Sequence, residues 1–260
     1  MIIVKVETPS LNLEIKPLPW DEKVLGSSVI QFEKLVVRHT EQATQRLQSI
    51  MQEMADKKVG FISCRLPHNA IQESMILEGL GFKFIEVVLH PFINLASHRT
   101  DRSCNSIKIE EAKPDELKKL SEIVEIAFDD DRFSVDLRIP RNCSGTRYKN
   151  WVLSSEKNSK QKVLNLSENS KSVGIFIVEE NHQHKKAYWH LTAIAPQYQG
   201  KGLGAKCWLS MLAKHKKQGF KEVSTTISSR NSRVLNLYSK MNFRFSEPEM
   251  TFHWINPNLF

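Results

Sequence analysis

The sequence predicts an α/β (α+β) protein in two parts, a smaller α/β domain over residues 1–100 and a larger domain over residues 101–260. Short β-branched or apolar runs alternate with segments whose apolar residues recur at helical spacing, which is typical of mixed folds. Residues 95–105 are rich in Ser, Asn, Arg and Thr, a composition that indicates a linker. A chain of 260 residues is long enough for one large or two ordinary domains.

The charge balance favours anionic partners. With 37 Lys and Arg residues against 29 Asp and Glu residues, the formal net charge is +8 and the pI is about 9.3. Coenzyme A, nucleotide sugars, nucleic acid and anionic lipid would all suit such a surface, and simple solvation of dispersed lysines would also explain it. The sequence has no recognition-helix, RNP or zinc-finger pattern, so we expect no nucleic-acid partner.

Membrane and metal signals are missing from the sequence. No apolar run approaches the ~18 residues of a membrane span, and the apolar stretch at residues 1–6 is too short for a secretory signal. We therefore expect a cytoplasmic protein without a membrane partner. The four cysteines are scattered without a C-x-x-C pair, which predicts reduced thiols and no metal site.

The first domain shows strand and helix patterns without a catalytic motif. Apolar runs predict strands over residues 29–37, 59–64 and 82–92. One helix face is marked near residues 47–54, and a second helix is expected over residues 69–80, with Asn69 as its N-cap and Gly81 as its terminator.

The second domain begins with a predicted strand over residues 107–110 and a helix that starts at Pro114, where acidic residues fill the first turn. A strand pair over residues 162–166 and 173–179 follows, joined by a turn of polar residues. The next strand, over residues 187–194, leads into the most informative stretch of the chain.

That stretch is Q-G-K-G-L-G over residues 199–204, and it opens onto a helix that begins at Ala205. Successive backbone N–H groups without Cβ atoms, together with the positive end of a helix dipole, form an anion site that suits a pyrophosphate. The spacing Q-x-x-G-x-G is neither a Walker loop nor the dinucleotide fingerprint, which argues against both nucleotide-binding folds.

The elements after this turn complete a recognisable order. A strand over residues 222–227 is followed by an amphipathic helix, in which Asn231 precedes Tyr238 by seven residues, and then by Asn242 and Phe243. This order resembles the GNAT acetyltransferases over residues 107–260. The resemblance implies a GNAT fold with a mixed central sheet, and acetyl-CoA as the cosubstrate without a metal.

The resemblance also implies a coenzyme site on the turn, on the end of the preceding strand and on the second helix. The expected coenzyme-binding residues are Ile194, Gln199, Gly200, Lys201, Gly202, Leu203, Gly204, Ala205, Asn231 and Tyr238. The pantetheine arm is expected to pair with residues 193–195, where a backbone N–H would polarise the thioester carbonyl.

Acetyl transfer also needs an acid for the leaving thiol and a base for the amine. By the resemblance, Tyr238 is the general acid, acting through a strong hydrogen bond with late proton transfer. His190 is the candidate base, since the strand before the turn carries no carboxylate. Asp131, Asp136 or a water relay are the alternatives, and both Tyr238 and His190 also fit structural roles.

A narrower resemblance concerns the acceptor. Arg and aromatic residues gather between the first helix and the hairpin, and a Pro-Trp pair lies near the start of the chain. These residues are similar to those of the dTDP-fucosamine N-acetyltransferases, which acetylate a 4-amino sugar carried on a nucleotide diphosphate: Phe128, Asp131, Arg132, Phe133, Tyr148, Trp151 and Pro19-Trp20. The resemblance implies an anionic nucleotide sugar as the amine substrate, contacted by Arg132, Tyr148 and Tyr188.

Other functions fit the same motif. The acceptor amine could instead belong to a peptide N-terminus, a lysine, a polyamine or a drug. A module that binds coenzyme A or nucleic acid without catalysis is an alternative of another class. The oligomeric state, monomer or homodimer, is left open.

Overall fold

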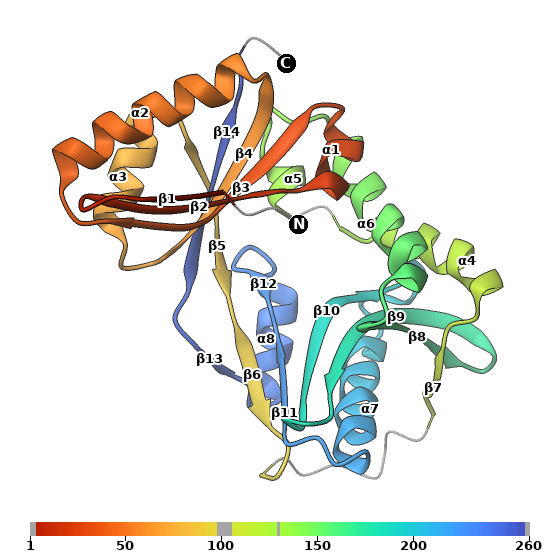
Figure 1. Cartoon of the computed structure of the whole chain (residues 1–260). Helices are drawn as coiled ribbons and strands as arrows, with labels where there is room; N and C mark the ends of the chain where they lie inside the picture. The colour runs from red at the N-terminus through yellow and green to blue at the C-terminus, as the bar shows by residue number, and fades with distance from the viewer. Residues whose placement is uncertain (1–3, 98–105, 129–130, 258–260) are drawn as a thin grey trace.

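The computed structural model describes residues 4–97, 106–128 and 131–257, which form two seven-stranded sheets (Figure 1). In order, the first sheet contains β1 (Val4–Glu7), β2 (Leu11–Pro17), β3 (Ser28–Val37), β4 (Val59–Pro67), β14 (Glu249–Ile255), β5 (Lys83–Leu89) and β12 (Ile227–Ser228). The second contains β13 (Arg244–Phe245), β6 (Pro91–Asn94), β11 (Glu222–Thr225), β10 (Lys186–Ile194), β9 (Lys171–Asn181), β8 (Gln161–Glu168) and β7 (Lys108–Glu111). Both sheets mix parallel and antiparallel neighbours, which confirms the predicted mixed α/β fold.

Helices cover both faces of the second sheet. Along β9, side chains alternate between two cores: Phe176 packs with α7 and α8, whereas Ile175 and Ile177 pack with α4 and α6. Long helices α2 and α7 each follow a central strand. The helices are α1 (Pro19–Leu25), α2 (Thr40–Asp56), α3 (Ile71–Gly79), α4 (Pro114–Glu125), α5 (Arg132–Val135), α6 (Asn142–Ser154), α7 (Leu203–Lys217) and α8 (Ser232–Lys240), with short 3-10 turns η2 (Ser155–Lys157) and η3 (Pro196–Tyr198). None of the described helices combines the length and the apolar character that a membrane crossing requires.

The two sheets repeat one arrangement. In the first sheet β1, β2 and β3 are successive antiparallel strands, and β4 joins β3 in parallel after α2. In the second sheet β8, β9 and β10 follow the same order, and β11 joins β10 in parallel after α7. Helix α3 then follows β4, and helix α8 correspondingly follows β11 and the short strand β12. The chain therefore contains two copies of one topology. We call the part from β1 to β6 the first repeat and the part from β7 to β14 the second repeat.

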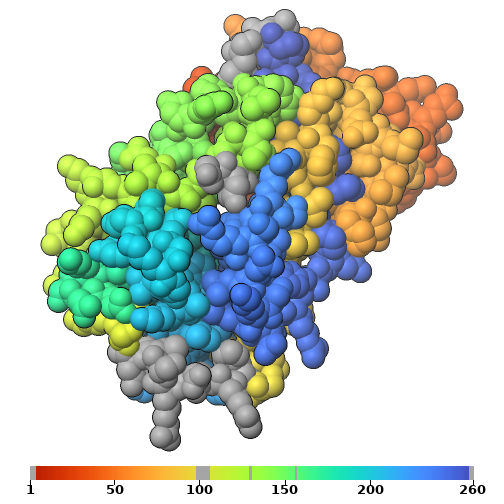
Figure 2. Space-filling model, turned by 180° about the vertical axis from the view of Figure 1, so that it is seen from behind, coloured from red at the N-terminus to blue at the C-terminus, as the bar shows by residue number. Residues whose placement is uncertain are grey.

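Each repeat gives a strand to the other sheet. β14, from the end of the chain, lies between β4 and β5, while β6, which follows β5, lies between β11 and β13. β12 also leaves the second repeat and pairs with β5. Seen from behind, the blue C-terminal segment lies directly against the yellow segment of the first repeat (Figure 2). Neither sheet is formed by one continuous stretch of chain.

Two local predictions in the first repeat are wrong. The strand expected over residues 82–92 divides at His90 into β5 and β6, which lie in different sheets. Ala70, without a side-chain cap, precedes α3, so Asn69 is not its N-cap. The predicted domain boundary near residue 100 falls among residues 98–105, outside the described part of the chain, and stays a prediction.

A buried histidine in the second repeat leads to a prediction on pH. His215 of α7 is fully buried, and its Nε2 accepts a hydrogen bond from Trp189 Nε1 at 3.0 Å, which requires an unprotonated nitrogen. Burial lowers the pKa of His215 from 6.5 to about 4. Below pH 6.5 the unfolded chain binds a proton here that the folded chain does not. We expect the free energy of unfolding to fall from pH 6.5 to pH 4, by up to about 3 kcal/mol from this group.

Urea unfolding of the wild type and of His215→Gln, measured at several pH values over this range, checks the prediction. The variant's free energy of unfolding should depend less on pH than that of the wild type. The same pH dependence in both proteins would contradict it.

Candidate functional site

The site begins where two parallel strands separate. β10 and β11 pair only through Lys186–Trp189 and Glu222–Thr225. Beyond Trp189, β10 continues along β9, while the chain leaves β11 and forms β12 at the edge of the first sheet (Figure 1). A cavity of about 370 Å³ lies in the opening, and side chains from both sheets line it. We call it the central cavity.

The glycine turn after β10 presents open amides. Gly200 and Gly202 have φ angles of +74° and +73°, a left-handed conformation that favours glycine, and Gly202 is the N-cap of α7. Among the residues that the structure describes, the N–H groups of residues 200–205 donate to no acceptor. A Cβ atom at Gly200 or Gly202 would meet no atom within 4 Å, so the chain's own side chains do not fill the turn. The geometry suits an anion at the start of α7.

Side chains at the edges of the turn hold it in place. Gln199 Nε2 donates to the carbonyl oxygen of Ile194 at 2.9 Å, and Gln199 Oε1 accepts from Arg233 of α8 at 3.0 Å. Lys201 Nζ donates to the carbonyl oxygen of Gln197 at 3.0 Å. Arg233, which the sequence analysis missed, adds a positive charge beside the open amides.

The end of β10 differs in one respect from the expectation for residues 193–195. The N–H of Ala195 donates to the carbonyl oxygen of Val173 at 2.9 Å, so this amide is not free to polarise a thioester carbonyl. Ala193 and Ile194 pair with β9 on one side of β10. Gly174 allows this close pairing, because a Cβ there would lie 2.8 Å from the carbonyl oxygen of Ala193.

The first repeat has no equivalent turn. Its β3 ends at Val37 and its α2 begins at Thr40, so that only Arg38 and His39 connect them. Neither residue is a glycine, and the connection is too short to form a row of open amides. Within the described residues, the repeated topology therefore carries one candidate coenzyme site, in the second repeat.

Tyr238 of α8 lines the central cavity. Its side chain is about 1% exposed, and burial raises its pKa to about 12, against the opposing effect of the polar side chains of Trp208, Thr225 and Thr192. The phenol therefore stays protonated at neutral pH. Asn231 also lines the cavity, and its Oδ1 accepts from the N–H of Val234 as the N-cap of α8.

His190 of β10 lines the same cavity and pairs with a carboxylate that the sequence analysis missed. Its Nε2 lies 3.1 Å from Oε2 of Glu179 on β9. The imidazole packs edge-on against Tyr188, with ring centroids 4.7 Å apart. Tyr188 in turn shares a hydrogen bond with Thr226. Glu179 escaped notice because it comes from the neighbouring strand, opposite Tyr188 in the β9–β10 register.

Arg132, Tyr148 and Tyr188, the predicted substrate residues, all line the central cavity. Arg132 is not free, because its Nη2 lies 3.0 Å from Oδ2 of Asp21. Asp21 is fully buried and also accepts from Arg147 Nε at 2.6 Å. Burial lowers the pKa of Arg132 to about 10, and Asp21 opposes this shift. This pairing holds α5 and α6 against α1.

The two alternative base candidates are engaged elsewhere. Asp131 accepts hydrogen bonds from the N–H groups of Phe133 and Ser134 and from Ser144 Oγ, and so caps α5. Asp136 lies outside the cavity lining; burial raises its pKa, but hydrogen bonds from His253 and Arg138 hold it well below its usual value. Because Asp131 and Asp136 are used in these contacts, His190 stays the candidate general base.

Tyr148 of α6 lines the central cavity. Its ring stacks on Phe128, with centroids 4.1 Å apart. Burial and the nearby Asp131 carboxylate raise the pKa of Tyr148 well above its usual range. The phenol is thus a hydrogen-bond donor at neutral pH.

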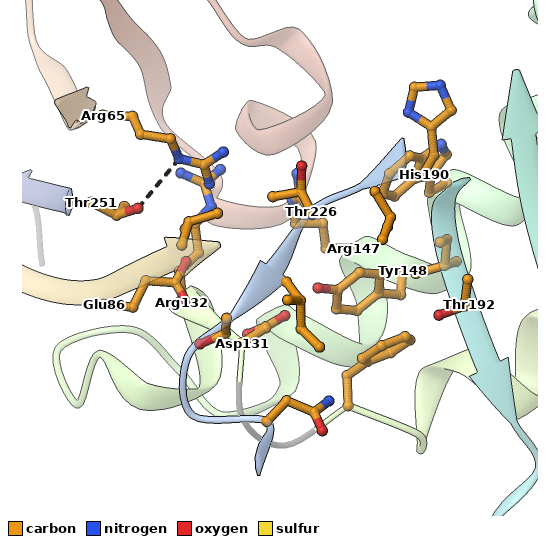
Figure 3. Close-up of a pocket in the computed structure, with 18 of the residues that line it drawn as sticks. Arg65, Glu86, Asp131, Arg132, Arg147, Tyr148, His190, Thr192, Thr226 and Thr251 are labelled. Carbon is orange, nitrogen blue, oxygen red and sulfur yellow. Dashed lines mark hydrogen bonds between the residues drawn. The ribbon is translucent and has the colours of Figure 1, made fainter. Parts of the chain in front are cut away.

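The opposite wall of the cavity comes from the first sheet, which the sequence analysis gave no site residues. Arg65 of β4, Thr251 of β14 and Glu86 of β5 line it, facing His190 and Thr192 of β10 across the opening (Figure 3). No spacing in the sequence signals this wall, because β14 joins it from the far end of the chain.

A second cavity, of about 790 Å³, adjoins the first. Both are lined by Trp20, Arg147 and Trp151, so the two cavities meet at these residues. The second cavity adds Lys23 of α1 and Lys157 of η2. Trp20 is 45% exposed, so the junction offers an accessible aromatic surface with cations beside it.

Comparison with known proteins identifies the second repeat. The model of the acetyltransferase (GNAT) family matches residues 122–243, which include β10, the glycine turn, α7 and α8. Residues 122–243 are a GNAT-family acetyltransferase domain. No curated protein matches the chain.

Solved structures resemble the acetyltransferase domain and the first repeat together. A GCN5-related N-acetyltransferase from Sphaerobacter thermophilus aligns with a TM-score of 0.65 at 13% identity, over 95% of this chain and 81% of that one. A functionally unknown conserved protein from Staphylococcus epidermidis gives 0.68 at 14%, over 98% and 94%. A tandem GNAT protein from the clavulanic acid biosynthesis pathway gives 0.62 at 11%, over 95% and 79%. At these identities the likeness concerns the fold.

The residues of the acetyltransferase domain fit the coenzyme that the family uses. Acetyl-CoA carries a diphosphate, and the open amides of residues 200–205 suit that group. Among the described residues, no cluster of His, Cys, Asp and Glu side chains is arranged to hold a metal ion.

Proposed function

We propose that this chain catalyses the acetyl-CoA-dependent N-acetylation of a small primary amine. The observation that carries the proposal is the central cavity. Tyr238, the part of β10 that has separated from β11, and charged side chains of the first sheet all line it. Asn231, which lines this cavity, is the N-cap of α8, and Arg233 of α8 contacts Gln199 of the open turn. A coenzyme on the turn would thus lie beside a cavity that suits a polar acceptor.

Acetyl-CoA would supply an acetyl thioester, and the chain's own residues would supply position and proton transfer. The amides of residues 200–205 would bind the diphosphate. Tyr238, whose pKa is about 12, would stay protonated and donate a hydrogen bond to the departing sulfur. His190, held by Glu179, is the group proposed to take a proton from the incoming ammonium.

Within the class of small amines we propose an amino sugar carried on a nucleotide, acetylated in the cytoplasm for surface-polysaccharide synthesis. The second cavity supports this choice. Trp20 and Trp151 offer aromatic faces, and Lys23 and Lys157 offer cations, where the two cavities meet and beyond. An acceptor with its amine in the central cavity could extend the base of its nucleotide in that direction.

Release of free thiol measures the activity directly. We expect thiol release when the protein is mixed with acetyl-CoA and dTDP-fucosamine, at a higher kcat/KM than with lysine, spermidine or a peptide N-terminus. Faster turnover of one of those amines would replace the proposed acceptor. Coenzyme A binding without turnover of any amine would instead favour a non-catalytic coenzyme-binding module.

A further inference from the structure

Three side chains of the first sheet lie in one row across three strands. In the strand register, Thr251 of β14 lies opposite Arg65 of β4 on one side and opposite Glu86 of β5 on the other. Residues that face each other in this way project to the same side of a sheet, and all three line the central cavity. Figure 3 shows the row, with Arg65 donating to Thr251. We call it the Arg65–Thr251–Glu86 row.

A carboxylate oxygen in this row has no partner. Glu86 is 5% exposed, and among the described residues its buried Oε2 accepts no hydrogen bond. Burial raises the pKa of Glu86, against the opposing effects of Ser228 and Arg65. A buried carboxyl oxygen without a donor costs stability, and a hydrogen-bond donor on a molecule bound in the cavity would remove that cost.

The guanidinium of Arg65 is also incompletely used. In the described part of the chain its hydrogen bond is the long one from Nε to Thr251 Oγ1, at 3.4 Å. Thr251 separates Arg65 from Glu86 by the width of two strand spacings, about 10 Å between backbones. Arg65 and Glu86 therefore line the cavity on either side of Thr251, and the described structure shows no ion pair between them.

The Arg and Asp side chains that line other parts of the central cavity have partners within the described structure. Arg132 and Arg147 are both paired with the buried carboxylate of Asp21. Asp131 is used by the cap of α5 and by Ser144. Arg65 and Glu86 therefore keep hydrogen-bonding atoms that an incoming molecule can use.

We infer that the Arg65–Thr251–Glu86 row is the acceptor-recognition subsite, and that it binds a fragment carrying an anionic group next to a hydrogen-bond donor. The anion, a carboxylate or a phosphate, meets Arg65, and a hydroxyl or ammonium of the same molecule donates to Glu86. This inference rests on the proposed function, because it assigns the acceptor end of the same cavity. It gives the first repeat a role in choosing the substrate.

Matched pairs of amines test the subsite. D-Glucosamine 6-phosphate differs from D-glucosamine by a phosphate, and L-lysine differs from cadaverine by a carboxylate. We expect the wild type to favour the anionic member of at least one pair by about 10-fold or more in kcat/KM, because hydrogen bonds to charged groups are among the stronger ones. The pair that shows the preference tells whether phosphate or carboxylate is recognised.

The variant Arg65→Gln should bring that ratio close to one, whereas Arg46→Gln, on the exposed side of α2, should leave it unchanged. Equal use of both members by the wild type, or a preference that Arg65→Gln retains, would overturn the subsite. If no amine is acetylated, the proposed function fails on its own. The subsite is then tested by thermal shift with D-glucosamine 6-phosphate and L-lysine, and an equal shift in wild type and Arg65→Gln would overturn it.

Glu86→Gln separates a binding role from a structural one. We expect it to lower kcat/KM for the favoured amine by about 10-fold and, because it removes an unpartnered buried carboxyl, to raise the midpoint of thermal unfolding by about 2–4 °C. Glu33→Gln, an exposed position on β3, is the control and should change neither. A lowered midpoint with unchanged kcat/KM would show that Glu86 serves the fold alone.

Discussion

Replacing Gly202 with valine is expected to weaken coenzyme A binding by about 10- to 100-fold, because left-handed strain at a β-branched residue costs about 1–3 kcal/mol. The φ angle of +73° suits glycine, and Gly202 caps the helix whose first amides are open. The surrounding space is empty, so strain and a shifted amide, rather than a clash, would cause the loss. Calorimetric titration of the variant with coenzyme A measures it.

Gly219 offers a matched control at the other end of α7. Its φ is +85°, and a Cβ there also meets no atom within 4 Å. Gly219→Val carries similar backbone strain and should lower the thermal midpoint, yet leave the dissociation constant for coenzyme A unchanged. A coenzyme affinity lost equally in both variants would point to general destabilisation of α7 instead of a bound diphosphate.

Tyr238→Phe is expected to slow turnover by about 10²- to 10⁴-fold, the usual range for a lost general acid, with coenzyme binding nearly intact. Burial raises the pKa of the Tyr238 phenol to about 12, so the wild-type hydroxyl carries its proton throughout the assay range. Steady-state release of free thiol, with saturating acetyl-CoA, gives the ratio of kcat values.

Tyr198→Phe is the matching control for this variant. Tyr198 belongs to η3, is half-buried, and does not line the central cavity. Its turnover should stay close to that of the wild type. If Tyr238→Phe also keeps wild-type turnover, Tyr238 has no part in proton transfer.

Local features of the acetyltransferase domain were predictable from its sequence, because each depends on a few neighbouring residues. Pro114 stands at the first position of α4, as predicted. The glycine turn leads into a helix, although α7 begins at Leu203, two residues before the predicted start. Asn242, after the end of α8, adopts a left-handed conformation with φ of +62°, which Asn tolerates better than most residues. Strand periodicity likewise located β8, β9 and β10.

The exchange of strands was beyond the reach of sequence reasoning. Residues 82–92 look like one apolar run, and only the partners of β5 and β6 decide that the run divides at His90. β14 has no local feature that assigns it to the first sheet rather than the second. Such choices depend on pairing between residues that lie far apart in the chain.

The candidate site likewise has one side that the sequence could predict and one side that it could not. Its coenzyme side could be proposed from a continuous motif and from residues on a single helix. Its acceptor side could not, because Arg65, Glu86 and Thr251 become neighbours only through β14. Arg132 was singled out by a resemblance, and its buried partner, Asp21, lies more than a hundred residues away in the chain.

We propose that the amides around Gly202 bind the diphosphate of acetyl-CoA. Calorimetric titration of the wild-type protein with coenzyme A and with pantetheine, which lacks the diphosphate and the 3′-phosphoadenosine joined to it, tests this directly. We predict that coenzyme A binds at least about 10-fold more tightly than pantetheine, since hydrogen bonds to a charged group supply the difference. Equal affinity for the two compounds, or no heat on addition of coenzyme A, would contradict the assignment.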